Sequence, residues 1–212
     1  MMKKNSIRQT ELISLLLILF PVLIGIFLYN RLPQKMATHF GMTNMPNAFS
    51  NKLWVIIGLP FLGIILQVMV FLILRNQKET KNLDFKIVNI TLWLVPVITN
   101  IVNLSLYAYA LGHKVKGSFI LSAFLGLFFI IFGNYLPKVS PNRFIGIRLP
   151  WTLRNSTNWH RTHHFAGWLF FISGIVLLLT SYWEMYWIVI AVVIIDILLI
   201  TCYSYSLSKN GY

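Results

Sequence analysis

The sequence predicts an all-α integral membrane protein with six transmembrane helices and with both termini in the cytoplasm. Hydrophobic residues make up 57% of the 212 residues and charged residues only 11%, whereas soluble domains typically have about 45–50% and about 25%. Six apolar stretches are long enough to cross about 30 Å of hydrocarbon at about 1.5 Å per residue. Lysine and arginine gather on one side of these stretches, which indicates their orientation.

The first apolar stretch follows a basic N-terminus and therefore resembles a signal peptide. It is longer than the apolar part of such a peptide, about 7–15 residues, and no small-residue cleavage site follows it, so we expect it to remain as the first span. The third stretch is overlong and is expected to tilt, and the fifth, the shortest, can extend upstream of His164. The six spans are expected near 11–30, 53–74, 87–111, 118–136, 164–180 and 187–205.

Little of the chain lies outside the spans, so we expect a single membrane domain over residues 1–212. Its N-terminal three-span module covers 1–111 and contains a long outer connector, 31–52. Its C-terminal three-span module covers 112–212 and contains a long inner connector, 137–163. The other connectors are short and are expected to join antiparallel helices.

The formal net charge of +13 reflects membrane topology rather than nucleic-acid binding. Thirteen of the 18 lysines and arginines lie at the two termini, in the connector 75–86 or in the connector 137–163, and five lie on the other side. This bias follows the positive-inside rule and places both termini in the cytoplasm. The excess charge also attracts anionic headgroups of the lipid bilayer. No direct binding of nucleic acid is expected.

Catalytic chemistry has little support in the sequence. The single cysteine, Cys202, lies within the last span, and no internal disulfide is possible. No phosphate loop, nucleophile with a base, or pair of catalytic carboxylates is recognisable. We therefore predict that the protein is not an enzyme and that it needs no cofactor. The five acidic residues are Glu11, Glu79, Asp84, Glu184 and Asp196.

The inner connector is expected to be folded because it is long, aromatic and stiffened. The stretch from Pro141 to Trp168 contains four arginines, three histidines, three tryptophans and two prolines. Pro141 and Pro150 preclude a continuous helix through its first half. Asn155 or Ser156 is suited to cap a helix that then runs into the fifth span. Long connections of this kind are more often functional than not.

Two stripes are expected on that helix. Trp159, His163 and Gly167 lie at i, i+4 and i+8 on one stripe, so His163 should face protein rather than lipid. The second stripe holds Arg161, His164 and Trp168, which are typical anchors at the cytoplasmic interface.

The histidines of the connector raise the possibility of a metal site. His160, His163 and His164 have a spacing at which two can share a metal. The connector contains no Asp, Glu or Cys that would complete the ligand set, and His39 is expected on the other side of the membrane, about 30 Å away. Hydrogen bonds from the histidines to backbone or headgroups are therefore favoured, and no metal site is predicted.

Asp196 lies at the midpoint of the last span, where a carboxylate is costly and often functional. The third span carries Thr99, Asn100 and Asn103, and Asn100 is expected at the depth of Asp196. We expect Asp196 to face that span within direct or water-bridged hydrogen-bonding reach of one of the three. Two roles stay open, a structural hydrogen bond or a proton or ion relay.

The outer connector is rich in turn formers, and its aromatic residues are expected to fold back onto the membrane surface. The turn formers are Gly41, Asn44, Pro46 and Asn47, and the residues expected at the membrane surface are His39, Phe40 and Phe49.

The inner segment N-R-F-I-G-I-R-L-P-W-T-L, followed by W-x-x-x-H-x-x-A-G-W, resembles the SdpI family of bacterial multi-pass immunity proteins. The outer segments L-P-x-x-x-x-x-H-F-G and P-N-x-F-x-x-K resemble the module that often precedes it. Two residues depart from the pattern, Leu149 where threonine is common and Met45 where glycine often precedes the proline. The matching positions are Asn142, Gly146, Arg148, Pro150, Thr152, Trp159, His163 and Gly167 in the inner segment, and His39, Pro46 and Lys52 in the outer one.

The resemblance implies that the protein resides in the cell membrane and protects a bacterial cell against a secreted, membrane-active peptide toxin. It also implies signalling, in which a soluble transcriptional repressor is held at the membrane. We expect Arg148 and His163 to be the polar working residues of a partner or ligand site in the inner connector, although bracing of the connector alone stays open. A small transporter that uses Asp196 and a purely structural membrane protein are the alternatives.

Overall fold

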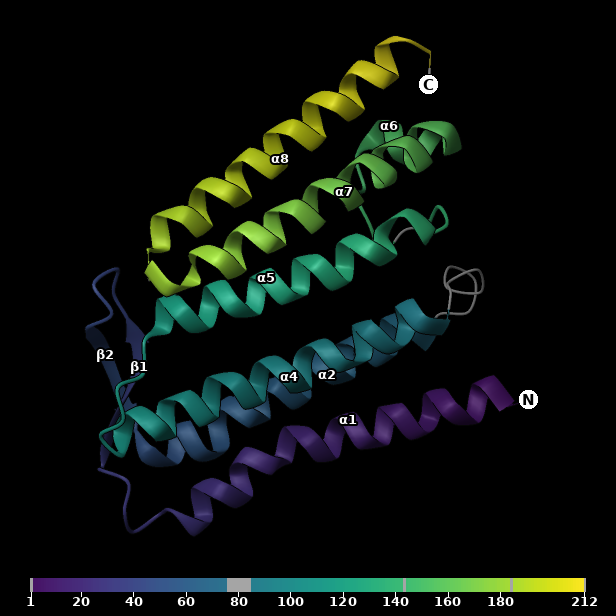
Figure 1. Ribbon diagram of the computed structural model, residues 1–212. Helices are drawn as coiled ribbons and strands as arrows, with labels where there is room; N and C mark the ends of the chain where they lie inside the picture. The colour runs from purple at the N-terminus through teal and green to yellow at the C-terminus, as the bar shows by residue number, and fades with distance from the viewer. Residues whose placement is uncertain (1, 76–84, 143, 184, 212) are drawn as a thin grey trace. The chain divides into compact units, whose positions relative to one another are not determined.

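The computed structural model describes residues 2–75, 85–142, 144–183 and 185–211, which fall into two compact units (Figure 1). Within this described part, six helices are long and apolar enough to cross a membrane, as the sequence predicted. Most of the basic connector expected at 75–86, together with Arg143, lies outside the described residues.

The first unit is built on three long helices, of which α4 packs against both of the others. Polar side chains connect them inside the apolar surroundings. The Asn100 amide donates to the Leu17 carbonyl at 2.9 Å, and the Tyr107 hydroxyl donates to the Pro21 carbonyl at 3.1 Å. The helices are α1 (Met2–Phe27), α2 (Leu59–Arg75), which follows a π-helical turn η1 (Trp54–Gly58), and α4 (Phe85–Ala110).

Two further polar contacts lie nearer the N-terminal end of α1. The buried Gln67 amide lies within donor distance of the Ser14 hydroxyl (2.9 Å) and the Leu92 carbonyl (3.1 Å), so it joins all three helices. Glu11 is buried and forms an ion pair with Arg75, with 2.6 Å between Oε2 and Nη2. The first helix ends at Phe27, three residues before the predicted end of the first span at residue 30.

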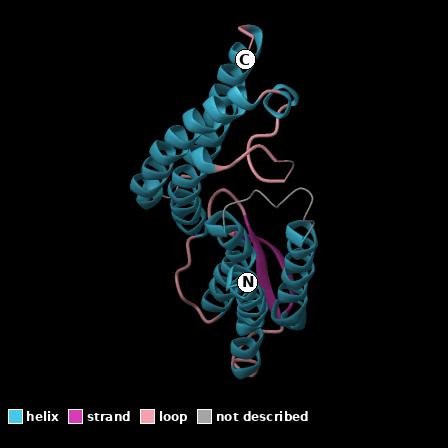
Figure 2. Cartoon of the chain, turned by 90° about the vertical axis from the view of Figure 1, so that its right-hand side faces the viewer, coloured by secondary structure: helices cyan, strands magenta, loops and turns pink. Residues whose placement is uncertain are grey.

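The outer connector forms a β-hairpin, so the prediction of an all-α protein was wrong here (Figure 2). Strand β1 (Lys35–Phe40) pairs in antiparallel fashion with β2 (Pro46–Asn51). Asn44 adopts a left-handed φ of 59°, and the Gly41 N–H donates to the Met45 carbonyl at 2.8 Å. The sequence showed these turn formers, but flanking segments of only six residues carried too little alternation to predict strands.

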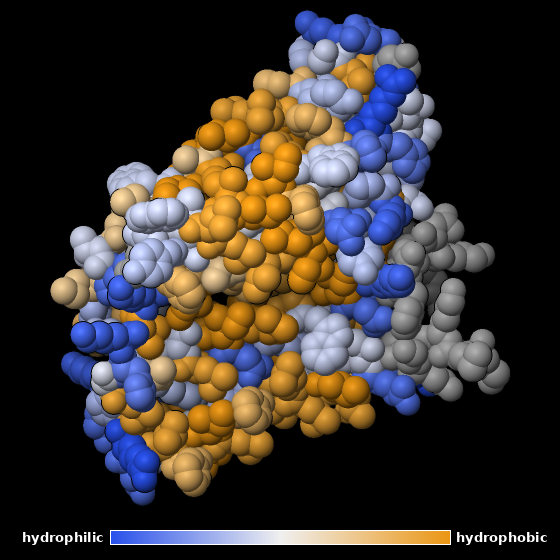
Figure 3. Space-filling view, viewed as in Figure 1, coloured by the Kyte–Doolittle hydropathy of each residue, from blue (hydrophilic) through white to orange (hydrophobic). Residues whose placement is uncertain are grey.

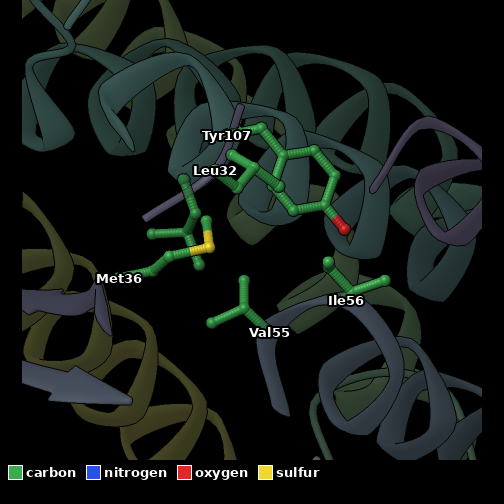
Figure 4. Close-up of a cluster of buried hydrophobic side chains, with 6 residues drawn as sticks. Leu32, Met36, Val55, Ile56 and Tyr107 are labelled. Carbon is green, nitrogen blue, oxygen red and sulfur yellow. The ribbon is translucent and has the colours of Figure 1, made fainter. Parts of the chain in front are cut away.

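A buried apolar cluster anchors the hairpin to the helices of the same unit (Figure 4). It is almost completely inaccessible to solvent and joins the loop, β1, η1 and α4. Burial of several aliphatic side chains against one tyrosine ring fixes where the hairpin starts. Its members are Leu32, Met36, Val55, Ile56, Leu106 and Tyr107.

The second unit has α7 packed against both α5 and α8 (Figure 1). The fifth span was predicted at 164–180, but its helix begins at Ser156, so the expected upstream extension is confirmed. The helices are α5 (Gly117–Tyr135), the 3₁₀ turn η2 (Leu136–Lys138), α6 (Pro150–Arg154), α7 (Ser156–Thr180), the 3₁₀ turn η3 (Ser181–Trp183) and α8 (Tyr186–Lys209).

Facing glycines bring α5 and α7 into close contact. A Cβ atom added to Gly174 would lie 2.6 Å from the Gly126 carbonyl oxygen, and one added to Gly167 would lie 2.7 Å from the Gly133 carbonyl oxygen. Small residues at such crossings replace the hydrophobic driving force that lipid does not supply. Within each unit, apolar side chains cover the middle of the helices and polar ones gather toward their ends (Figure 3).

Candidate functional site

The inner connector is a folded loop, and side chains of the motif that resembles the SdpI family hold it in place. Asn142 organises its first turn: the amide donates to the carbonyls of Ser140 (2.8 Å) and Ile145 (2.9 Å). The side-chain oxygen Oδ1 of Asn142 accepts the N–H groups of Phe144 (2.8 Å) and Ile145 (2.7 Å). One asparagine therefore satisfies four backbone groups of a segment that neither helix nor sheet supports.

His163 holds the next part of the loop. Its Nδ1 lies 2.8 Å from the Trp159 carbonyl, which can only accept, so Nδ1 carries the proton. Nε2 is then the acceptor for the Ile147 N–H at 3.0 Å. The imidazole is fully buried, as expected from its stripe, and stacks on the Trp159 ring with 4.0 Å between centroids. The indole N–H of Trp159 donates to the Val139 carbonyl at 2.7 Å, so both rings fasten the connector.

Gly146 lets the backbone pass across these two rings. Its φ is +121°, a value that L side chains rarely adopt. A Cβ atom at this position would collide with His163 Nε2 and would lie 3.0 Å from the Trp159 ring. Both backbone strain and direct contact therefore require glycine here.

Thr152 fastens the end of the loop from the start of α6. Its fully buried hydroxyl accepts the Leu149 N–H at 2.9 Å and lies 2.8 Å from the Ile147 carbonyl and 2.9 Å from the Leu149 carbonyl. Pro150 opens α6 at the first helical position, where a missing N–H costs nothing. Together, His163 and Thr152 satisfy both backbone groups of Ile147.

Asn155 caps α7, as the sequence predicted. Its side-chain oxygen Oδ1 accepts the N–H groups of Thr157 (2.8 Å) and Asn158 (3.1 Å). At the other side of the connector, Gly167 packs directly on Pro137, because a Cβ atom there would lie 2.7 Å from the proline ring.

A buried polar network that the sequence analysis missed joins the connector to α8. The Trp151 indole N–H donates to the Ser204 hydroxyl at 2.8 Å. This hydroxyl donates to the side-chain Oδ1 of Asn158 at 3.0 Å and lies 2.9 Å from the Thr162 hydroxyl. The Asn158 amide donates to the Ser204 carbonyl at 3.1 Å. The spacing of Asn158 and Thr162, four residues apart, was the available signal, but nothing in the sequence pointed to Ser204 as their partner.

The basic residues of the connector lie on its surface. Arg148 is exposed, unlike His163, so the two residues expected to work together have different surroundings. His160 and His164 are exposed as well. An open groove of about 520 Å³ lies beside them, lined by Pro137, His160, Arg161, His164, Phe165, Trp168 and Tyr203. Among the described residues, no group of three or more His, Cys, Asp or Glu side chains is placed to hold a metal ion.

Within the second unit, Asp196 bonds to a residue that the sequence did not point to, Ser173. The Asp196 side chain is buried, and its Oδ1 accepts the Ser173 hydroxyl of α7 at 2.8 Å. The predicted partners bond within the first unit: Thr99 donates to the Val95 carbonyl, Asn100 to the Leu17 and Pro96 carbonyls, and Asn103 to the Thr99 carbonyl. Asp196 and the third span belong to different units, so the expectation that Asp196 faces that span stays a prediction.

The three outer positions lie at the hairpin of the first unit. His39 is exposed and donates from Nδ1 to Asn47 Oδ1 at 2.6 Å, and Pro46 opens β2. Lys52 is buried at 5% exposure. Its ammonium donates to the Tyr29 carbonyl at 3.1 Å and lies 3.8 Å from the centre of the Tyr29 ring. Lys52 therefore ties the end of the hairpin to the end of α1.

Comparison with known proteins agrees with the motif. Residues 138–204 match the SdpI/YfhL protein family, and residues 16–64 match a domain of unknown function, DUF1648. The chain is also 26% identical over 216 residues to the immunity protein SdpI of Bacillus subtilis (strain 168), which covers 99% of both chains. No solved structure matches. The resemblance seen in the sequence is confirmed, and the chain is a multi-pass protein of the cell membrane.

Proposed function

On the premise that residues 138–204 of this chain are an SdpI/YfhL family region, we propose that the protein protects a bacterial cell against a secreted, membrane-active peptide toxin. The observation that carries this proposal is the alignment with an immunity protein over 99% of both chains. Alignment over nearly the full length includes the hairpin, the inner connector and all six apolar helices, so it supports a shared role better than a match to one motif would.

We assign the sensing side to the outer hairpin and the signalling side to the inner connector. This assignment assumes that both termini lie in the cytoplasm, which the distribution of lysine and arginine indicates. The two three-span modules, 1–111 and 112–212, act in it as one membrane domain. Single cysteines at Asn47 and Asn155, in a Cys202→Ser background, should react with a membrane-impermeant thiol reagent from opposite sides. Reaction of both from the same side contradicts this topology.

The inner connector is proposed to hold a soluble transcriptional repressor at the membrane. An exposed cation supports this part of the proposal, because Arg148 projects from a loop whose backbone is fixed by hydrogen bonds to the buried side chains of His163 and Thr152. A fixed loop presents charged groups without a large entropic cost on binding. His163 serves this site by bracing the loop, since a fully buried imidazole has no surface for a partner.

The alternative, a small transporter that uses Asp196, has one observation in its favour. Asp196 lines a pocket and is buried at the middle of α8. A proton relay, however, needs a second titratable group within reach, and Asp196 is the only one among the described residues that line this pocket. If Asp196→Asn leaves toxin resistance intact, toxin resistance does not depend on transport through Asp196.

The test of the protective role is deletion of the gene in its own host. Cells without the protein should lose viability in conditioned medium from wild-type cultures, and a plasmid copy should restore it. Equal survival of deleted and wild-type cells would remove the protective role.

The connector is tested with Arg148→Gln, compared with Arg148→Lys and with Arg154→Gln as the control of equal charge. The readout is induction of a reporter gene that the repressor controls. If both Arg148 variants reach normal membrane abundance but lose induction, whereas Arg154→Gln keeps it, the result supports a site that needs the guanidinium fork. Unchanged induction in all three removes Arg148 from the mechanism.

A further inference from the structure

The second unit contains a pocket that the protective role does not explain. It has a volume of about 260 Å³ and lies between α5, α7, α8 and the inner connector. Its walls are apolar, with Phe129, Phe170 and Ile200 from the helices and with Ile147 and Leu149 from the connector. Asp196 is the one acidic residue among the described residues that line it. A carboxyl group in such surroundings requires a partner.

Only half of the Asp196 carboxyl group is satisfied. Oδ1 accepts the Ser173 hydroxyl at 2.8 Å, whereas Oδ2 is buried and has no hydrogen-bond partner among the described residues. Asp196 itself is only 2% exposed. Within a membrane there is no bulk water to compensate a buried polar atom, so this arrangement is costly unless something else binds there.

Two simple occupants fit the pocket poorly. A metal ion needs several ligands, and the described part of the chain offers no group of three or more candidate side chains here or elsewhere. An ordered water needs about three polar partners, but the polar side chains lining the pocket are Asp196 and Thr201. An occupant must therefore combine a hydrogen-bond donor with an apolar body.

We propose that this pocket binds the alkylammonium end of an amphiphile dissolved in the bilayer. The ammonium N–H groups donate to Oδ2, and if the proton moves to the acid, the carboxyl O–H donates to the amine nitrogen instead. The alkyl chain packs on the two phenylalanines and on the aliphatic walls. The pocket volume of about 260 Å³ equals that of roughly nine water molecules at about 30 Å³ each. This volume suits the end of one alkyl chain but neither a helix nor a polycyclic compound.

The occupant would also contact the connector directly. Ile147 lines the pocket, and its N–H and carbonyl are held by His163 and Thr152. Binding at Asp196 would thus place the occupant against the loop segment that carries Arg148. This site goes beyond the protective role, and its test needs neither a toxin nor a repressor.

The experiment uses the full chain in lipid nanodiscs and two photoreactive probes. One is a decylamine that carries a diazirine in its chain, and the other has the same chain and charge but ends in trimethylammonium, which has no N–H. Crosslinks are mapped by peptide mass spectrometry. The primary amine should label α8 at 193–201 at least about tenfold more than the trimethylammonium probe, because the hydrogen bonds to a charged group are lost.

Three variants test the assignment. Asp196→Leu removes the acceptor and Val193→Phe fills the pocket, and each should reduce labelling by the amine at least about tenfold. Leu198→Phe, on the exposed side of α8, should leave it unchanged. If Asp196→Leu does not fold, as judged by gel filtration and circular dichroism, the labelling of Val193→Phe alone tests the proposal. Equal labelling by both probes, or labelling that no pocket variant reduces, overturns the proposal.

Discussion

His163 Nε2 accepts the Ile147 N–H at 3.0 Å, which fixes a non-helical segment against a membrane helix. Backbone groups without secondary structure are tolerated near the bilayer only where protein satisfies them. The other imidazole nitrogen is bonded to the carbonyl of its own helix at Trp159. The ring is therefore set in one orientation and in one tautomer, with the acceptor directed at the loop.

Replacement of His163 by leucine is expected to lower stability by about 1–3 kcal/mol, because the Ile147 N–H, bonded inside the folded connector, loses its acceptor. His163→Gln should be less harmful, since its side-chain oxygen reaches close to the position of Nε2. Unfolding in mixed micelles, followed by circular dichroism, measures both. The exposed neighbour His164→Leu is the control and should change little. Equal losses for leucine and glutamine at position 163 would show that the acceptor is unimportant.

Gly146→Ala is expected to destabilise the protein by about 3 kcal/mol, from backbone strain together with the collision at His163. Gly112→Ala provides a matched control, because Gly112 also has a positive φ, +88°, but a Cβ atom there meets nothing within 4 Å. The difference between their melting temperatures isolates the contact. Equal melting temperatures of the two variants would contradict the close approach of Gly146 to His163.

Trp151 and Ser204 should be energetically coupled, because the indole N–H donates to the serine hydroxyl at 2.8 Å. A double-mutant cycle of Trp151→Phe and Ser204→Ala is expected to give a coupling of about 0.5–1.5 kcal/mol. The same cycle with Ser208 in place of Ser204 serves as the reference, since the Ser208 hydroxyl bonds to the Tyr205 carbonyl instead. Additive effects in both cycles would mean that the connector is not tied to α8 through this bond.

Gly174→Ala is expected to separate α5 from α7 and to cost about 1–3 kcal/mol, since its Cβ atom would lie 2.6 Å from the Gly126 carbonyl oxygen. Spin labels on the lipid-exposed residues Leu127 and Ile175 would report the separation as a longer distance. Gly41→Ala is the control, because a Cβ atom there has only ordinary contacts, the nearest at 3.5 Å. An unchanged distance together with unchanged stability would refute tight glycine packing.

The amino-acid sequence by itself determined the six apolar helices, the cap at Asn155 and the burial of His163. These features depend on local composition and on residues three or four positions apart, which one helix places together. Only the tertiary structure decided the hairpin, the pairing of Asp196 with Ser173 and the role of Ser204. Each of these needs a partner at least six positions away in the chain, which is beyond one helical turn. In lipid, apolar surfaces attract one another weakly, so close packing of small residues selects which helices meet.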